Sequence, residues 1–140
     1  MSPDTSNDLR TIVTGYLPTP EGNAALEAAQ KWAQASGATL IVVNTGREGD
    51  YSHPSFASAQ DIDAIDAELA KAGIDHEVRQ PTDGKSAAES ILGVAATSGA
   101  DLIVIGMRRR SPVGKLITGS TAQQILLDAS CPVLSVKPSS

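Results

Sequence analysis

Five short runs along the chain have the apolar patterns of β-strands. Residues 39–44, with a continuously apolar run at Leu40–Val43, and residues 102–105 are expected to be strands that are buried on both faces. Residues 74–78 alternate between apolar or histidine side chains and charged ones, which is typical of a half-exposed edge strand. Residues 11–14 and 133–136 are predicted to form the first and the last strand.

Between these runs lie segments with the 3.6-residue period of helices. The first begins at Thr19-Pro20-Glu21, where a capping hydroxyl, a proline at the first position and a carboxylate favour a helix start, and Gly37 ends it. Capping boxes at Ser86–Glu89 and Ser120–Gln123 predict two further starts. The predicted inward positions are Ala25, Ala28, Ala29 and Trp32; Ile62, Ile65 and Leu69; Ala88, Ile91, Leu92 and Ala95; and Ala122, Ile125, Leu126 and Ala129.

Strands and helices therefore alternate throughout, which predicts an α/β fold with a parallel sheet covered by helices on both faces. Such sheets bind ligands beyond the carboxyl ends of the strands, at the point where the strand order reverses. The pattern alone does not say which two loops flank that point. At 140 residues the chain has the size of one domain, which we place at residues 10–138 after a disordered tail at residues 1–9.

Charge narrows the choice of ligand. The net charge of −5 argues against nucleic acid as a partner, yet no acidic residue occurs between Asp101 and Asp128, where four of the 11 basic residues lie. A local positive loop on an acidic body indicates a small anion. The opening residues lack the pattern of a signal peptide and the apolar runs are too short to span a bilayer, so we expect a cytoplasmic protein without membrane contact.

The segment from Asp101 to Pro138 carries the clearest chemical signal. A strand ends at Gly106, a loop containing Gly114 and Gly119 follows, and Ser120 opens a helix. Glycine lets backbone amides approach a ligand closely, and the free amides at a helix start point toward an anion. Phosphate is the anion that this arrangement predicts. Gly119-Ser120 is also explained as a simple helix cap, and Arg108–Arg110 as a solvated surface.

The spacing of these residues resembles the universal stress protein family. Members that bind ATP carry Gly, two residues, Gly, nine residues, and then Gly followed by Ser or Thr, and this chain has Gly106, Arg109 and Gly119-Ser120 at those positions. The likeness extends to the opening strand and to the closing Cys131–Leu134 segment. It implies a single five-stranded, parallel, doubly wound sheet of strand order 3-2-1-4-5, a Rossmann-like, nucleotide-binding α-hydrolase-like fold.

The resemblance also implies a site. The turn after the first strand would face the Gly106 loop, and in ATP-binding members that turn carries an Asp where this chain has Leu17. Arg109 in place of a glycine is a second departure, so we expect a degenerate site with weak binding of ATP or AMP, and Mg²⁺ only with the nucleotide. The candidate nucleotide-binding residues are Gly15, Tyr16, Leu17, Thr45, Gly106, Arg108, Arg109, Lys115, Gly119, Ser120 and Thr121.

Three functions remain open on the sequence. The first is a non-catalytic stress-response regulator that binds an adenine nucleotide, the second a nucleotide-free dimeric regulator recognised by protein partners of unknown identity, and the third a slow Mg²⁺-dependent nucleotide hydrolase. No nucleophile, base and acid can be assembled into a catalytic site, and His53 and His76 lack the spacing of metal ligands. The resemblance implies a homodimer through the last strand, with Val133, Leu134 and Val136 at the interface.

Overall fold

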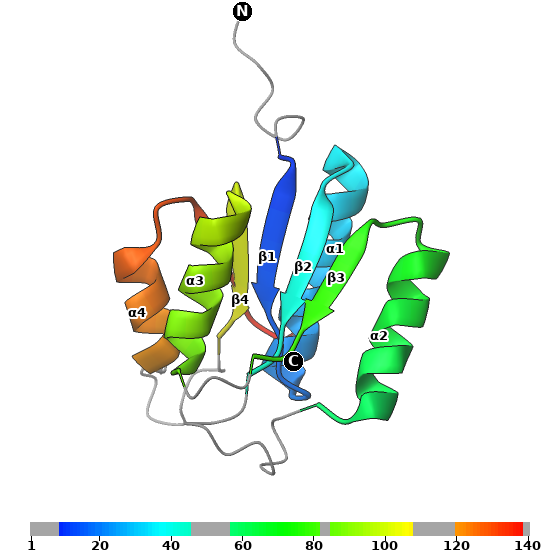
Figure 1. Ribbon diagram of the computed structural model, residues 1–140, viewed down its shortest axis with the longest axis horizontal. Helices are drawn as coiled ribbons and strands as arrows, with labels where there is room; N and C mark the ends of the chain where they lie inside the picture. Colours follow the sequence, from blue (N-terminus) through cyan, green and yellow to red (C-terminus); the bar gives the residue numbers. More distant parts are fainter. Residues whose placement is uncertain (1–8, 46–56, 82–84, 108–119, 139–140) are drawn as a thin grey trace, which may run out of the picture.

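Five parallel strands form the centre of the structure, a computed structural model that describes residues 9–45, 57–81, 85–107 and 120–138 (Figure 1). The strand order is β3-β2-β1-β4-β5, as the family resemblance implied. In chain order the elements are β1 (Thr11–Gly15), α1 (Pro20–Ser36), β2 (Thr39–Val43), α2 (Ala59–Lys71), β3 (His76–Arg79), α3 (Ala87–Ser98), β4 (Leu102–Gly106), α4 (Ser120–Asp128) and β5 (Val133–Val136). The predicted tail at residues 1–9 lies outside the described residues except for Leu9, which packs partly against the core.

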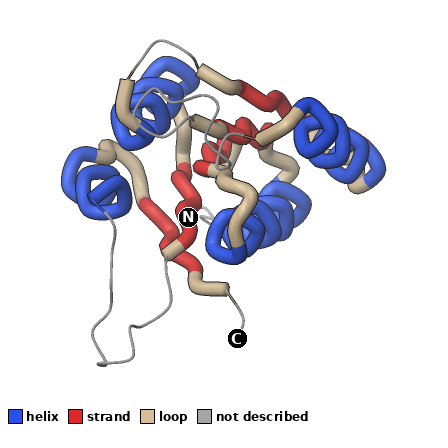
Figure 2. The backbone as a smooth tube through the Cα atoms, turned by 90° about the horizontal axis from the view of Figure 1, so that it is seen from below, coloured by secondary structure: helices blue, strands red, loops and turns tan. Residues whose placement is uncertain are grey.

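Two apolar layers enclose the sheet, and Figure 2 shows it between helices on both sides. Along β1, β2 and β4 successive side chains point to opposite faces, so each strand contributes to both layers. One layer joins Ile12, Leu40 and Val104 to α1 and α2. The other joins Val13, Ile41, Val43, Ile103 and Ile105 to α3 and α4. Burial on both faces explains the continuously apolar runs Leu40–Val43 in β2 and Leu102–Ile105 in β4.

Most helix ends follow local rules that the sequence revealed. Thr19 caps α1 by accepting a hydrogen bond from the Gly22 amide at 3.1 Å, and Gly37 ends the helix with a left-handed φ of 75°. Ser86 opens α3 with the expected capping box. A further box, formed by Ser58 and Asp61 at the start of α2, was missed because only apolar positions were used to locate that helix. Helix α4 begins at Ser120, and the predicted capping box there involves a side chain that lies outside the described part of the structure.

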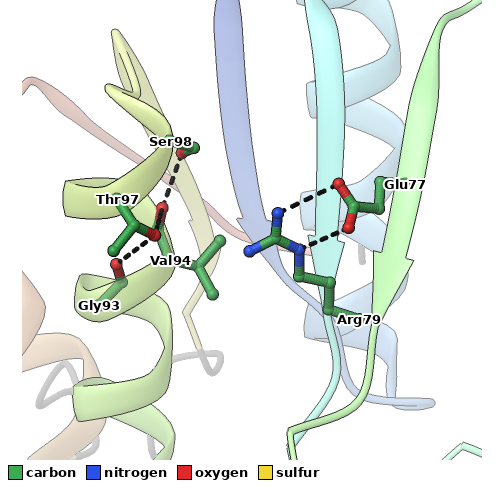
Figure 3. Close-up of polar contacts among 6 residues, drawn as sticks. All are labelled: Glu77, Arg79, Gly93, Val94, Thr97 and Ser98. Atoms are coloured by element: carbon green, nitrogen blue, oxygen red, sulfur yellow. Dashed lines mark hydrogen bonds and ion pairs between the residues drawn. The ribbon is translucent and has the colours of Figure 1, made fainter.

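The β3 edge is covered by polar side chains on the face turned toward α3. Arg79 donates to both carboxylate oxygens of Glu77, from Nε at 2.7 Å and from Nη2 at 3.1 Å (Figure 3). The hydrogen bond from Arg79 lowers the pKa of the Glu77 carboxyl. On the opposite face Val78 packs against the core and His76 Nε2 lies 3.0 Å from Asp66 Oδ1 on α2. The predicted half-exposed edge strand is therefore confirmed.

Two predicted inward residues are wrong. Trp32 is 39% exposed and Leu126 is 47% exposed, although both were assigned to the buried helix faces. Each lies on the flank of a buried stripe that is only as wide as its neighbours can cover. The nine-residue helix α4 has α3 on one side and turns Ala122 and Ile125 toward the sheet, which leaves Leu126 uncovered.

Candidate functional site

A cleft of about 190 Å³ opens at the carboxyl edge of the sheet, between the ends of β1 and β4. The chain leaves β1 toward β2 and leaves β4 toward β5, so this is the point where the strand order reverses. The cleft is lined by Gly15, Tyr16, Leu17, Glu21, Gly22, Val43, Thr45, Ile91, Ile105, Gly106, Met107, Thr121, Ala122 and Ile125.

Six of the candidate residues line this cleft together. They are Gly15, Tyr16, Leu17, Thr45, Gly106 and Thr121. They come from four separate segments of the chain, and only the sheet topology brings them together. Arg108, Arg109, Lys115 and Gly119 lie outside the described residues, and of Ser120 only the backbone, at the start of α4, is described.

Glycines let three backbone segments meet at the wall of the cleft. A Cβ placed on Gly22 would lie 1.8 Å from the Leu17 carbonyl oxygen, and one placed on Gly106 would lie 2.0 Å from the Glu21 carbonyl oxygen. Atoms cannot approach that closely, so both positions require glycine for space. The end of β4 therefore rests against the first turn of α1, which in turn rests against the Leu17 turn.

The two helix starts at the cleft differ in charge. The first turn of α1 already carries the Glu21 carboxylate and the Thr19 cap. The first turn of α4 contains no acidic residue. Because a helix start attracts negative charge unless a carboxylate already lies there, an anion in this cleft is favoured at α4.

Apolar side chains form another part of the cleft lining. Val43, Ile91, Ile105 and Ile125 are almost fully buried and face a space large enough to admit a flat, uncharged group. Thr45 is only 5% exposed, and its hydroxyl makes no hydrogen bond within the described residues. A buried hydroxyl without a partner is uncommon, and at the edge of a cleft it offers a hydrogen bond to a ligand.

Tyr16 has both a buried ring and a place in the cleft lining. Burial, and to a smaller extent the Asp61 carboxylate, raise the pKa of its phenol above the ordinary value. The phenol therefore stays protonated at neutral pH. It remains available as a hydrogen-bond donor next to the turn that carries Leu17.

Several residues of the site were not predicted from the sequence. Glu21 and Gly22 look like an ordinary helix start, and only the close contact with Leu17 reveals their place in the cleft. Asn44 lies just behind the lining and is fully buried. A polar residue directly after an apolar strand was the available signal for it, because a buried amide needs hydrogen-bond partners.

The described residues contain no group of three or more His, Cys, Asp or Glu side chains placed to hold a metal ion. Among the described lining residues the titratable side chains are Tyr16 and Glu21. The arrangement is suited to binding a ligand with an anionic group, which the start of α4 favours, and an apolar group, which the apolar lining favours. Within the described part of the chain, no helix has the length and apolar character needed to cross a membrane.

Comparison with known proteins gives a consistent result. Residues 9–137 match the model of the universal stress protein family. A universal stress protein of Mycolicibacterium smegmatis is 40% identical over 127 residues, which cover 91% of this chain and 97% of the relative. A protein of Thermus aquaticus, named "Universal stress protein in QAH/OAS sulfhydrylase 3'region", is 35% identical over 136 residues and covers 91% of this chain and 98% of the relative.

Solved structures agree on the fold. A universal stress protein from Archaeoglobus fulgidus superimposes with a TM-score of 0.75 at 27% identity, over 92% of this chain and 98% of that one. A universal stress protein from the same organism in complex with dAMP gives 0.65 at 22% identity, over 94% of this chain and 99% of that one. A universal stress protein in complex with cAMP gives 0.66 at 22% identity, over 94% and 98%.

Proposed function

The chain belongs to the universal stress protein family, and on that premise we propose that it is a stress-response regulator that binds an adenine nucleotide in the cleft between β1 and β4. The observation that carries this proposal is the meeting, in one cleft, of an apolar wall with a helix start free of acidic residues. The apolar wall suits the adenine base, and the helix start suits the phosphate. The dAMP and cAMP complexes of similar proteins support the same class of ligand.

We propose a site without turnover. Hydrolysis of a nucleotide requires a group that positions or deprotonates water and, usually, a metal held by carboxylates. Glu21 is the carboxylate in the described lining, and it lies at the α1 side, away from the favoured position of the phosphates. Any Mg²⁺ would then arrive with the nucleotide, held mainly by its phosphates.

Leu17 makes the proposed site a weak one. Leu17 lines the cleft, and a leucine side chain offers no hydrogen bond to a ribose or a base. We expect dissociation constants for ATP and AMP above about 10 μM, which corresponds to about −6.8 kcal/mol or less favourable binding. Titration calorimetry measures this, and a submicromolar constant would show that the site is not degenerate.

Leu17→Asp is expected to tighten AMP binding about tenfold or more. The new carboxylate would supply a hydrogen bond to a charged acceptor, a type of bond that contributes roughly 1.5–3 kcal/mol. Leu17→Asn is the matched control, because it has nearly the same shape without the charge, and we expect a smaller gain. Equal affinities of the Asp variant and the wild type would contradict the assignment of this position.

We further propose a homodimer through β5. This edge strand pairs with β4 alone, and its Leu134 and Val136 pack only partly against the core beneath α1. Gln34 donates to the Ala72 carbonyl at the end of α2, and Trp32, two residues earlier, lies roughly 200° around α1 from it. Trp32 therefore lies on the β5 side of α1, where it extends the apolar edge.

The dimer is tested by Leu134→Lys and by Trp32→Glu, which both place a charge on this edge. Each is expected to be a monomer by light scattering at tens of micromolar protein, where the wild type is a dimer. Trp32→Glu leaves the core intact because that side chain is already 39% exposed. Leu127→Glu is the control, since Leu127 is 83% exposed on the outer side of α4, and it should remain dimeric. A monomeric wild type would contradict the proposed dimer.

A cytoplasmic location stays a prediction from the sequence.

A further inference from the structure

Asn44 is a fully buried amide that joins three segments at the carboxyl edge of the sheet. Its Nδ2 donates to the Tyr16 carbonyl oxygen at 2.9 Å, and its Oδ1 accepts from the Ala57 amide at 2.8 Å. These backbone partners fix the orientation of the side-chain amide, because a carbonyl only accepts and an N–H only donates. Gln80 Nε2, at the end of β3, donates to the same Oδ1 at 3.0 Å.

One arm of this network holds the turn that forms a wall of the cleft. The Tyr16 amide donates to the Val43 carbonyl at 2.8 Å, while the Tyr16 carbonyl accepts from Asn44. Two successive positions at the end of β2 therefore hold Tyr16 through both of its backbone polar groups. Leu17 follows directly, and its position against Gly22 depends on the direction in which the chain leaves Tyr16.

The other arm anchors Asn44 itself. Gln80 Nε2 also donates to the Ala57 carbonyl at 2.9 Å, so Asn44, Ala57 and Gln80 form a closed set of hydrogen bonds. The backbone amide of Asn44 donates to the Arg79 carbonyl at 3.0 Å. The side chain is thus held by β3 and by the start of α2 while it holds the β1–α1 turn. Asn44 does not line the cleft.

We propose that Asn44 is a positioning residue for nucleotide binding, which acts on the ligand through the Tyr16–Leu17 turn. The proposal rests on the proposed function, because it assigns how that same cleft keeps its shape. Without the Asn44 donor, the buried Tyr16 carbonyl loses its hydrogen bond. Because an unsatisfied buried carbonyl is costly, we expect the turn to shift so that this carbonyl reaches water. The wall of the cleft moves with it.

Asn44→Asp tests the donor to the Tyr16 carbonyl by itself, because it changes that group and keeps the size and shape of the side chain. A protonated carboxyl has the shape of the amide, donates to the Tyr16 carbonyl and still accepts from Ala57 and Gln80. An ionised carboxylate keeps both acceptor contacts but presents an oxygen to the Tyr16 carbonyl oxygen, and the two repel each other. Burial disfavours the ionised form, so the switch between the two forms falls above the usual range of an aspartate.

The test compares AMP binding by the wild type and Asn44→Asp from pH 5 to pH 8, by titration calorimetry. The ratio of their dissociation constants cancels the ionisation of AMP itself. We expect a ratio near one at the acidic end and a ratio of about ten at the alkaline end, since a buried unpartnered acceptor is costly. Asn23→Asp is the control, because it makes the same change at an exposed site on α1 outside the cleft lining, where the carboxylate stays ionised above pH 5.

A ratio for Asn44→Asp that is independent of pH, like that of Asn23→Asp, would overturn the proposal. Hydrogen exchange and NMR measurements on the wild type, without and with AMP, cover the case in which Asn44→Asp does not fold. The Asn44 side-chain amide protons are expected to exchange slowly with solvent and to respond together with the Leu17 amide when AMP is added. Rapid exchange of the Asn44 side-chain amide would also overturn the proposal, whereas slow exchange without any AMP binding would overturn the proposed function instead.

Discussion

Gly22→Ala is expected to destabilise the protein by at least about 3 kcal/mol in urea unfolding, although alanine is the better helix former. The added methyl group would lie 1.8 Å from the Leu17 carbonyl oxygen and 2.7 Å from the Leu17 amide nitrogen. These are backbone atoms, and Thr19 holds the same turn through hydrogen bonds from its amide to Leu17 and from Gly22 to its hydroxyl. No flexible side chain is present to give way.

Gly93→Ala is the matched control, because Gly93 also lies within a helix. A Cβ at that position would meet nothing within 4 Å, so the substitution should stabilise the protein by roughly 0.5–1 kcal/mol. Opposite signs for the same chemical change would show that the Leu17 contact, and not helix propensity, decides the result. Equal effects of the two substitutions would contradict the close approach of the Leu17 turn to α1.

Thr121→Glu should reduce AMP affinity at least about a hundredfold while it leaves the free energy of unfolding unchanged or slightly higher. Thr121 is exposed, lies in the first turn of α4 and lines the cleft. A carboxylate there interacts favourably with the helix start, which accounts for the retained stability. The same carboxylate occupies the position proposed for phosphate and repels it.

Titration calorimetry and urea unfolding on the same preparation give the two readouts. Gln124→Glu introduces the same charge one turn later, at an exposed position outside the cleft lining, and we expect only a small loss of affinity from it. If Thr121→Glu bound AMP as the wild type does, the phosphates would have to lie elsewhere. A similar loss in both variants would point to a general effect of charge and not to a contact at Thr121.

Local patterns predicted those features that depend on neighbours in sequence. The caps at Thr19 and Ser86 and the left-handed Gly37 follow from the backbone needs of each helix end, so a few residues suffice to recognise them. The strand order is different in kind. Alternating elements predict a parallel sheet, but the 3-2-1-4-5 order came from the family resemblance, which the structure and the comparisons confirm.

Features that depend on distant contacts were not visible. In the sequence Gly22 is an ordinary helix residue, and only the structure shows the Leu17 carbonyl beside it. In the sequence Asn44 only follows a strand, and only the structure shows its hydrogen bonds with Tyr16, Ala57 and Gln80. Helical period gave the direction of the buried face but not its width. Leu126 was therefore assigned to the core, although its side chain is 47% exposed.

The difference between the two edges of the sheet decides how many copies can join. The β3 edge is covered by charged and histidine side chains, whereas the β5 edge carries Leu134 and Val136. If both edges of the sheet could pair with another copy, chains could add head to tail and form an open filament. When only the β5 edge can pair, a two-fold contact uses the β5 edges of both chains. The β3 edges that remain are covered by polar side chains, so the proposed assembly stops at two chains.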